Sequence, residues 1–350
     1  MSIGIGIIGC GKISQIRHIP ELSIVPGADL VGYFNPTRSR AEQMSAKYGG
    51  KVYDDIDSML ADPAIDAVVV ALANSAHAEV TVKALKAGKD VLCEKPMATT
   101  IEECEEMMSA AKESGRLLLI AQNQRLAGAH MKAKELIENG EIGKVLTFHT
   151  AFGHSGPENW SIKPGKDTWF FDKKKAAMGA MADLGIHKTD LIQFLLGENI
   201  VGVTAVLTTL DKRGPDDKLI DVEDNAVCIY RMESGVTGTM TSSWTYYGEE
   251  DNSTVIYGTE GLLRIYDRPG IPLQHISKDG TVRSIETEAI QTNDNQTASG
   301  IAEEFIRCLE SRTGGYLSAE SVIPAMRAVF AAKKSSDEGV FVFIPKNSKG

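Results

Sequence analysis

Basic residues, paired cysteines and long apolar runs are all scarce in this chain. Its 350 residues include 37 Lys and Arg against 47 Asp and Glu, so the formal net charge is −10. Nucleic acids and anionic membranes bind basic faces, so this balance argues against both as main partners. No segment reaches the roughly 20 apolar residues that a membrane helix needs. The first residues also lack the basic lead-in of a signal peptide.

The cysteines provide neither a disulfide framework nor a metal site. There are five, an odd number, and no pair has the spacing of metal ligands: Cys10, Cys93, Cys104, Cys228 and Cys308. This usage predicts a reduced, cytoplasmic protein without bound metal.

The first 122 residues alternate between short apolar runs and helical patterns. Strands are expected at Gly4–Ile8, Asp29–Phe34, Lys51–Tyr53, Ala67–Leu72, Asp90–Cys93 and Leu117–Ala121. Helices are expected at Ser39–Tyr48, His77–Ala87 and Thr100–Ser114. The run from Ala67 to Leu72 is apolar throughout, as in a strand covered on both faces. The alternation predicts a doubly wound, parallel α/β sheet.

The pattern changes near Gln124. One helix is expected at Ala129–Asn139, and two more at Ser299–Ser311 and Ala319–Glu338. The strands between and after them are longer on average: Lys144–Ala151, Val201–Leu210, Asn225–Arg231, Gly235–Trp244, Ser253–Tyr257, Gly261–Tyr266 and Val340–Ile344. Apolar residues alternate with threonines in Gly235–Trp244, which is typical of a sheet with one apolar face. A second domain is therefore expected over residues 123–350.

A glycine-rich turn, Gly9-Cys10-Gly11-Lys12-Ile13-Ser14, follows the first predicted strand and opens a helix. Gly9 permits a tight turn, and Gly11 lets the backbone approach a pyrophosphate that the helix N-terminus stabilises. Ser14 stands where glycine or alanine is usual, so a plain strand-to-helix turn is the alternative. The context favours a dinucleotide site that includes Gly9, Gly11, Lys12 and Ile13.

The end of the second strand bears on cofactor preference. An Asp or Glu there would bind the adenosine ribose, but the position holds Asn35. Asn35 does not repel a 2′-phosphate, and the Arg38 guanidinium could pair with one. The sequence therefore favours NADP(H). The alternative is that Asn35 binds the ribose of NAD while Arg38 is solvated.

The segment Asn74-Ser75-Ala76-His77 ends the fourth strand and begins a helix. Ligands bind at this edge of doubly wound sheets. Asn74 and His77 are therefore candidate cofactor contacts, with helix capping as the alternative for His77.

Glu94-Lys95-Pro96 closes the fifth strand. Lys95 offers a positive charge and a proton donor where an alkoxide would develop. Pro96 restricts Lys95 to extended backbone, and a cis bond between them is one possibility. We predict that Lys95 is catalytic and that Glu94 and Lys95 lie beside the cofactor. A surface salt bridge between Glu94 and Lys95 is the alternative.

Asp183 and His187 are one helical turn apart, with Asp190 nearby. A carboxylate beside an imidazole raises its basicity and fixes its orientation. His187 could therefore accept the hydroxyl proton as hydride leaves the carbinol carbon, or return it during reduction. Apolar residues supply the buried side of this helix: Leu184, Leu191, Ile192 and Leu195. An ordinary surface helix with an Asp–His pair is the alternative.

Together these motifs resemble the glucose–fructose oxidoreductase, inositol dehydrogenase and rhizopine-catabolism (Gfo/Idh/MocA) oxidoreductase family. The resemblance covers nearly the whole chain, including the segment Glu138-Asn139-Gly140-Glu141-Ile142-Gly143-Lys144-Val145 and the pattern Asp183-x-Gly185-x-His187-x-x-Asp190. It implies a Rossmann domain, then an α/β domain with a large, open, mostly antiparallel sheet, and an active site in the cleft between them. It also implies that Lys95, Asp183 and His187 are the catalytic trio, with Asp190 near the substrate.

The chain departs from the family pattern near the expected site. Ala177 and Met178 stand where relatives often have glycines before the catalytic helix. Asn123 and Gln124 replace bulkier or basic substrate contacts, so the substrate preferences of relatives do not transfer. Trp169 lies in a loop whose aromatic, amide and carboxylate groups suit a sugar or polyol. The alternative is a loop that closes the edge of a core. Asn123, Gln124 and Trp169 are therefore predicted substrate contacts.

The predicted activity is NAD(P)-dependent hydride transfer to or from a sugar, inositol or related polyol. One alternative is an NAD-dependent glycosidase that oxidises its substrate transiently and eliminates. Another is a non-catalytic NAD(P)-sensing regulator, against which the intact catalytic trio argues. The threonine-rich strand face, and the resemblance to a family whose members often form dimers or tetramers, predict a homodimer or homotetramer.

Overall fold

The computed structural model describes residues 2–288 and 298–345, which form two compact units. The first contains the described residues up to Asn123 together with residues 298–323, and the second contains residues 124–288 and 324–345. The sequence predicted a single boundary after residue 122. The structure places this boundary one residue later, after Asn123, but assigns residues 298–323 to the first unit instead of the second.

The sheet of the first unit has six strands in the order β3-β2-β1-β4-β5-β6, all paired in parallel. The strands are β1 (Ile3–Ile8), β2 (Ala28–Phe34), β3 (Lys51–Val52), β4 (Ala67–Val70), β5 (Asp90–Cys93) and β6 (Leu118–Ile120). Every residue of β4, β5 and β6 is buried, as their apolar runs predicted. The parallel, doubly wound sheet is therefore confirmed.

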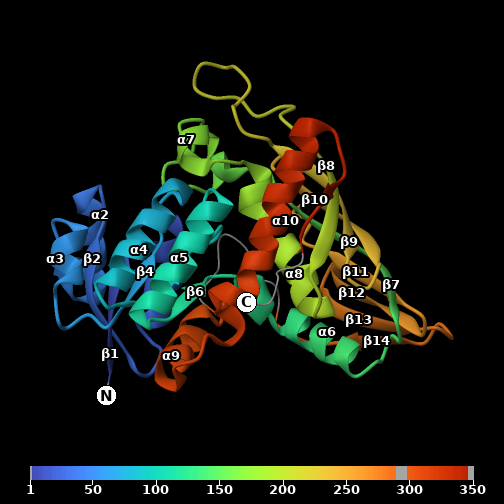
Figure 1. The fold of residues 1–350 in the computed structure, drawn as a ribbon, viewed down its shortest axis with the longest axis horizontal. Helices are drawn as coiled ribbons and strands as arrows, with labels where there is room; N and C mark the ends of the chain where they lie inside the picture. Colours follow the sequence, from blue (N-terminus) through green and yellow to red (C-terminus); the bar gives the residue numbers. More distant parts are fainter. Residues whose placement is uncertain (1, 289–297, 346–350) are drawn as a thin grey trace. The chain divides into compact units, whose positions relative to one another are not determined.

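The first unit's helices are α1 (Ile19–Leu22), α2 (Arg38–Tyr48), α3 (Ile56–Leu60), α4 (His77–Lys86), α5 (Ile101–Ser114) and α9 (Ile301–Ser311), with the π-helical turn η1 (Ser14–His18) and the 3₁₀ turns η2 (Asn74–Ala76) and η7 (Gly315–Leu317). Figure 1 shows α4 and α5 side by side along the sheet. Helix α5 begins with a capping box between Thr100 and Glu103 and ends at Gly115 in the left-handed conformation. Local sequence therefore specifies where this helix starts and stops.

Hydrogen bonds and an ion pair attach residues 298–323 to the rest of the first unit. The Glu21 carboxylate accepts hydrogen bonds from the backbone N–H of Ser299 at 2.5 Å and from its hydroxyl at 2.9 Å, just before α9. The Arg312 guanidinium donates two bonds to the carboxylate of Asp90, at 2.6 and 3.0 Å. These partners are far apart in sequence, which is why a reading of local patterns left the segment in the second domain.

The sheet of the second unit has nine strands among the described residues, in the order β14-β13-β12-β11-β7-β10-β9-β8-β15. Only the β7–β10 pair is parallel among these pairs. The strands are β7 (Val145–Gly153), β8 (Ile200–Thr208), β9 (Asn225–Met232), β10 (Thr237–Ser243), β11 (Thr254–Gly258), β12 (Gly261–Arg268), β13 (Ile271–Ser277), β14 (Val282–Ile285) and β15 (Val342–Phe343). The sequence missed β13 and β14, and Pro272 interrupts the strand signal of the first.

The second unit's helices are α6 (Gly128–Glu138), α7 (Lys173–Ala176), α8 (Ile186–Leu196) and the later turns of α10 (Ala319–Glu338). Shorter turns are η4 (Pro157–Asn159), η5 (Trp169–Phe171) and the π-helical η6 (Met181–Gly185), while η3 (Asn123–Leu126) joins the two units in sequence. Helices α6 and α8 pack on each other and on the sheet (Figure 1).

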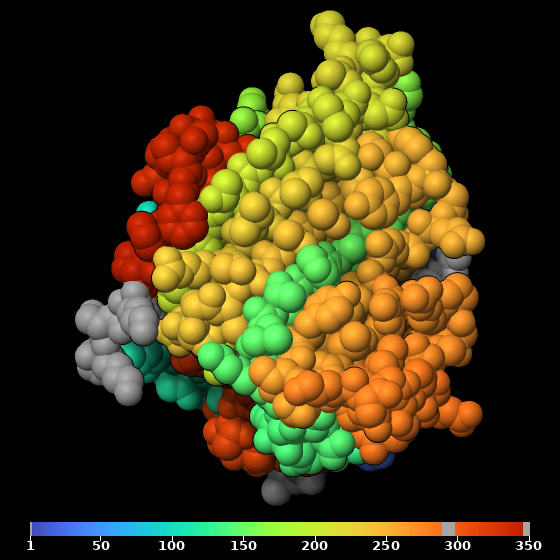
Figure 2. Space-filling view, turned by 90° about the vertical axis from the view of Figure 1, so that its right-hand side faces the viewer, coloured from blue at the N-terminus to red at the C-terminus, as the bar shows by residue number. Residues whose placement is uncertain are grey.

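The opposite face of this sheet is open, as Figure 2 shows, with β7 in green crossing between its neighbours. Large apolar side chains are exposed on β7, β8 and β9: Leu146, Val206, Val227 and Ile229. Val206 is paired directly with Val227 across β8 and β9.

Candidate active site

The carboxyl ends of four strands of the first unit lie level with one another. Ile8 of β1 is paired with Val70 of β4, Val70 with Cys93 of β5, and Cys93 with Ile120 of β6. The glycine-rich turn, the segment at Asn74, the Glu94-Lys95-Pro96 segment and Gln122 therefore follow the same edge of the sheet. Ligands of doubly wound sheets bind at this edge.

The backbone of the glycine-rich turn has the form that the sequence predicted. Gly9 has φ of +104°, and a Cβ there would lie 2.3 Å from the carbonyl oxygen of Ala71, so only glycine fits. A Cβ on Gly11 would have only that same oxygen within 4.0 Å, so the space beside Gly11 is open. Lys12 and Ile13 follow, both partly exposed. The turn thus leaves room for a pyrophosphate against its backbone.

Ser14, the unusual residue of the fingerprint, contributes to the turn. Its side chain is buried, and its hydroxyl donates a 2.5 Å hydrogen bond to the carbonyl oxygen of Gly9. The hydroxyl fixes the turn to the start of η1, so the departure from glycine or alanine leaves the turn intact.

Asn35 and Arg38 are both engaged by neighbouring groups. The Asn35 side chain is buried, accepts from the Cys10 backbone N–H at 2.9 Å and donates to the Thr37 carbonyl at 3.0 Å. The half-exposed Arg38 guanidinium donates to Glu42 at 2.8 Å and forms an ion pair with Asp54. Asn35 thus links the end of β2 to the glycine-rich turn, and Arg38 is paired with two carboxylates.

Asn74 and His77, the two predicted cofactor contacts after β4, are buried. The His77 ring nitrogens lie 2.8 Å from the Pro96 carbonyl oxygen and 3.2 Å from that of Leu72. Burial lowers the pKa of His77, against the opposing effect of the Pro96 carbonyl. The ring therefore braces the backbone that follows Lys95, a role that the sequence did not indicate.

Glu94 is buried in an ionic cluster beneath Lys95. One carboxylate oxygen contacts the His18 ring at 2.7 Å and the Arg17 guanidinium at 3.5 Å. The other accepts from the backbone N–H of Lys95 at 3.0 Å. Burial raises the pKa of Glu94, but His18, Arg17 and Lys95 outweigh it and hold the pKa well below its usual range.

Lys95 itself is partly exposed, and its bond to Pro96 is cis, the isomer that the sequence left open. Both oxygens of Glu94 are thus used by His18, Arg17 and backbone in a buried cluster, which differs from the surface salt bridge considered as the alternative. Sequence reasoning missed Arg17 and His18 because nothing in their local pattern indicates a partner 76 or 77 residues away.

Asp183 and His187 of the second unit lie on η6 and α8, and each is 6% exposed. Asp183 accepts a 3.0 Å hydrogen bond from the indole N–H of Trp244. The His187 ring packs on Phe152 with centroids 5.7 Å apart. The predicted apolar side of the helix is buried, but so are its polar residues, including Lys188 and Asp190. The alternative of an ordinary surface helix is therefore wrong.

The start of this helix is clamped by Glu223. Its carboxylate accepts from the N–H groups of Gly179 at 2.8 Å and Met181 at 3.1 Å. Burial raises the pKa of Glu223 to about 7, against the lowering effect of these N–H groups. Just before it, Ala177 has φ of 66° and ψ of −47°, a conformation that favours glycine. The loop in which alanine replaces the family's glycine is therefore strained.

The predicted substrate contacts have different surroundings. Arg125 donates to both carboxylate oxygens of Asp190, at 2.7 and 2.5 Å, and both residues are buried. Gln124 donates to Asn252 at 3.1 Å, and Asn123 begins η3. Trp169 stacks on Phe170 with centroids 3.9 Å apart. Asp190 thus has a structural partner that the sequence did not reveal.

Lys188, next to His187, was not singled out by the sequence. Its side chain is fully buried, and its ammonium group donates a 2.9 Å hydrogen bond to the Asn252 carbonyl. Burial lowers the pKa of Lys188 to about 7, against the opposing charges of Asp251 and Glu250. The helix of Asp183 and His187 therefore contains a buried amine whose pKa lies close to physiological pH.

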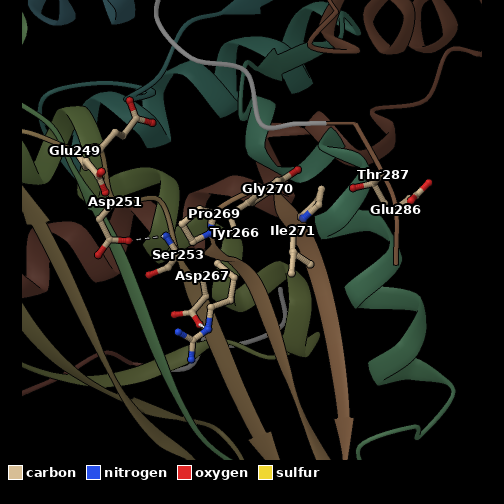
Figure 3. Close-up of a pocket in the computed structure, with 13 residues that line it drawn as sticks. Glu249, Asp251, Ser253, Tyr266, Asp267, Pro269, Gly270, Ile271, Glu286 and Thr287 are labelled. Atoms are coloured by element: carbon tan, nitrogen blue, oxygen red, sulfur yellow. Dashed lines mark hydrogen bonds and ion pairs between the residues drawn. The ribbon is translucent and has the colours of Figure 1, made fainter. Parts of the chain in front are cut away.

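A cavity of about 980 Å³ lies within the second unit (Figure 3). Five carboxylates line it, against the single guanidinium of Arg268: Glu249, Glu250, Asp251, Asp267 and Glu286. The residues predicted as catalytic are not among its lining. Acidic side chains alone do not define a ligand, and we assign none to this cavity.

The structure also tests the described residues for free thiols, metal-binding clusters and membrane-spanning helices. All five cysteines are buried free thiols. Within residues 2–288 and 298–345, no group of three or more His, Cys, Asp or Glu is arranged to hold a metal ion. No helix in that part of the chain combines the length and apolarity needed to cross a bilayer.

Comparison with known proteins defines the class. The model described as "Oxidoreductase family, NAD-binding Rossmann fold" matches residues 3–122, and the "GFO/IDH/MocA C-terminal domain" model matches residues 130–264. The chain is thus an oxidoreductase with an NAD-binding Rossmann domain. It belongs to the Gfo/Idh/MocA family, as the sequence motifs predicted.

Individual relatives agree with this assignment. A 1,5-anhydro-D-fructose reductase of Ensifer adhaerens is 30% identical over 264 residues, 74% of either chain. A scyllo-inositol 2-dehydrogenase (NAD(+)) of Bacillus subtilis is 30% identical over 261 residues, 74% of this chain and 72% of that one. The structure of a levoglucosan dehydrogenase in complex with NADH and levoglucosan has a TM-score of 0.88 at 23% identity, over 99% of this chain and 100% of that one. This last likeness concerns the fold.

Proposed function

We propose that the chain transfers a hydride between a nicotinamide cofactor and a hydroxyl or carbonyl group of a sugar, inositol or related polyol. One observation carries the proposal: the register of β1, β4 and β5 brings Lys95 to the same sheet edge as the glycine-rich turn. The open space beside Gly11 fits a pyrophosphate at that turn. The reductase and dehydrogenase named above, which act on anhydrofructose and scyllo-inositol, support the substrate class.

The proposed roles follow from the chemistry of each side chain. The bound nicotinamide would supply or accept the hydride. The Lys95 ammonium stabilises negative charge on the reacting oxygen, and His187 takes up or returns the hydroxyl proton. Asp183, held by the Trp244 indole N–H, orients His187. We propose that Lys95 and His187 act on the same carbon–oxygen bond.

The cofactor would be held by residues at the edge of the first unit's sheet. Gly9, Gly11, Lys12 and Ile13 would contact the pyrophosphate, and Asn35 and Arg38 lie on the adenosine side. Asn74, His77, Glu94 and Lys95 would surround the nicotinamide half. Asn123, Gln124 and Trp169 remain the proposed substrate contacts. We keep Asp190 near the substrate but assign its carboxylate first to Arg125.

A substrate panel with single-residue variants tests this function. Sugars, inositols and anhydrosugars are offered with NAD or NADP, and nicotinamide absorbance is followed. We expect turnover of at least one polyol, and a loss of about a thousandfold or more in kcat for Lys95→Ala and His187→Ala. Both variants should bind NADH within about threefold of the parent protein. Lys86→Ala, an exposed lysine of the first unit, is the control and should keep full activity.

Other outcomes would identify the alternatives. Full activity in either variant would refute the mechanism. Cleavage of a glycoside with no net change in nicotinamide absorbance would indicate the glycosidase. Tight cofactor binding without turnover of any compound would indicate the sensor.

We propose NAD rather than NADP as the preferred cofactor, in place of the preference that the sequence favoured. Arg38, which was to pair with a 2′-phosphate, already contacts Glu42 and Asp54. A phosphate would have to displace or approach these two carboxylates, and like charges repel. We expect kcat/KM with NAD to exceed that with NADP by about tenfold or more. A loss of NADP efficiency alone in Arg38→Ala would instead support NADP(H).

We further propose that the open face of the second unit's sheet mediates self-association into a homodimer or homotetramer. Val206, Val227 and Ile229 are exposed there on adjacent strands, and exposed apolar patches mark protein contacts. Light scattering coupled to size-exclusion chromatography should show a dimer or tetramer, and Val227→Glu should shift it toward the monomer. A monomeric parent protein would contradict this.

We also propose a cytoplasmic location. The five free, buried thiols suit a reducing compartment. Fractionation of cells that produce the protein should recover it with cytoplasmic markers.

A further inference from the structure

Gln122 has a buried side-chain amide that is unpaired in the part of the chain that the structure describes. Its side chain is 1% exposed, and neither the amide nitrogen nor the amide oxygen has a hydrogen-bond partner within the described residues. Leaving buried polar groups unpaired lowers stability, so native proteins rarely do so without a reason. A polar ligand with both a donor and an acceptor would satisfy the amide.

The register of the sheet places Gln122 beside Lys95. Ile120 of β6 is paired with Cys93 of β5, and the backbone N–H of Ala121 continues the ladder to the Cys93 carbonyl at 2.9 Å. Gln122 and Lys95 both lie two residues beyond this pair. Neighbouring strands are about 4.8 Å apart, so the segments that carry Lys95 and Gln122 leave the sheet at adjacent places on one edge.

The position of Gln122 along the sheet edge corresponds to the nicotinamide half of a bound dinucleotide. The glycine-rich turn follows β1 at the centre of the sheet, and Asn35 follows β2 on one side of it. A dinucleotide bound across the turn has its adenosine on the β2 side and its nicotinamide on the side of β4, β5 and β6. Gln122 follows β6, about three strand spacings or 14 Å from β1, within reach of the nicotinamide end.

We propose that Gln122 binds the carboxamide group of the nicotinamide ring. A glutamine amide and a carboxamide each carry one carbonyl acceptor and one NH₂ donor, so they pair through two hydrogen bonds. This contact fixes the rotation of the ring and thus which of its faces receives or delivers the hydride beside Lys95. The inference rests on the proposed function for the presence of the nicotinamide, but it concerns binding alone.

The test compares ligands that share the adenosine half. NADH, ADP-ribose and the reduced 3-acetylpyridine analogue of NADH are titrated by fluorescence or calorimetry, without any polyol. ADP-ribose lacks the nicotinamide, and the acetyl group keeps the carbonyl but lacks the NH₂ donor. We expect Gln122→Leu to weaken NADH binding about five- to thirtyfold while ADP-ribose affinity changes less than about twofold. The parent protein should favour NADH over the acetyl analogue, and the variant should lose that preference.

Controls separate this contact from a general loss of structure. Gln43→Leu makes the same change at an exposed position of the first unit and should leave all three affinities unchanged. Unaltered ADP-ribose binding shows that the variant's glycine-rich turn is folded. Equal weakening of NADH and ADP-ribose would overturn the proposal, as would unchanged NADH affinity, which indicates a buried amide that bonds water. A parent protein that binds NADH but turns over no polyol would refute the proposed function and leave this inference standing.

Discussion

The two regions that carry the proposed chemistry differ in whether the surrounding protein favours the charged or the neutral form of a buried group. Glu94, beneath Lys95, is buried against Arg17 and His18, and its charged form is favoured. On the helix of Asp183 and His187, burial instead disfavours charge at Lys188, and also at Glu223 where the helix begins. Opposite charges outweigh desolvation at Glu94, whereas the hydrogen-bond partners of Lys188 and Glu223 are backbone groups.

This difference separates two ways of positioning a reactive group. In the first unit an ion cluster holds the backbone of Lys95, so its stability depends on keeping every charge paired. In the second unit, packing, the Arg125–Asp190 ion pair and hydrogen bonds hold the helix of Asp183 and His187, and the buried Lys188 amine lowers stability. Removing the Glu94 charge should therefore destabilise the first region, and removing the Lys188 charge should stabilise the second.

The largest effect is expected from Glu94→Gln. The substitution removes the buried carboxylate charge that pairs with Arg17 and His18, and breaking a buried ion pair in this way costs about 3–5 kcal/mol. Urea unfolding followed by far-UV circular dichroism measures this loss of stability. Tryptophan fluorescence would not report the first unit, because Trp160, Trp169 and Trp244 are all in the second. Glu42→Gln, at an exposed acid of the same unit, should change stability by less than about 0.5 kcal/mol. A cost below about 1 kcal/mol for Glu94→Gln would contradict the ionic-cluster account.

Lys188→Met should stabilise the second unit in a pH-dependent way. Burial lowers the pKa of Lys188 from 10.5 to about 7, so between these values the unfolded chain binds more protons than the folded chain. The stability of the parent protein therefore rises with pH across this window, and the full penalty applies below pH 7. We expect Met to add on the order of 3 kcal/mol at pH 6 and progressively less toward pH 10.

Urea unfolding followed by tryptophan fluorescence measures this effect, since the fluorescence reports the second unit. Lys173→Met, at an exposed lysine of the same unit, should show no such pH dependence. A difference between Lys188→Met and the parent protein that is constant from pH 6 to 10 would show that the Lys188 amine is charged in the folded state.

Trp244→Phe tests whether the hydrogen bond from the Trp244 indole to the Asp183 carboxylate positions the second region. Phe keeps a ring in the core but removes the N–H that donates to Asp183 at 3.0 Å. We expect kcat to fall about tenfold, as the loss of one such bond to a charged group predicts, with NADH affinity unchanged. Trp160→Phe is the matched control, because the Trp160 N–H has no acceptor among the described residues. Equal losses in both variants would assign the effect to packing.

The smallest effect concerns Ala177, the strained residue before the helix of Asp183 and His187. Ala177→Gly should relieve its left-handed backbone and raise stability by about 1 kcal/mol, less the added freedom of glycine in the unfolded chain. Ala176→Gly, one residue earlier in α7, should instead lower stability by a similar amount. Tryptophan fluorescence in urea compares them. A lower stability for both variants would mean that Ala177 is not strained.

The sequence by itself determined the elements whose signals are local. Apolar runs and glycines predicted the parallel sheet and the turn at Gly9, because each depends on a few neighbouring residues. Period-2 alternation likewise predicted the one-sided strand at Gly235–Trp244, which the structure places at Thr237–Ser243.

Only the tertiary structure decided the partners and the burial of the charged groups. Arg17 and His18 meet Glu94, Arg125 meets Asp190, and Glu21 holds the segment at Ser299, all across long stretches of chain. The burial of Lys188 was also decided by the tertiary structure, because no neighbouring residue in the sequence indicates it. The energy of a charge depends on which groups surround it in space, and the folded chain draws those groups from residues that no local pattern connects.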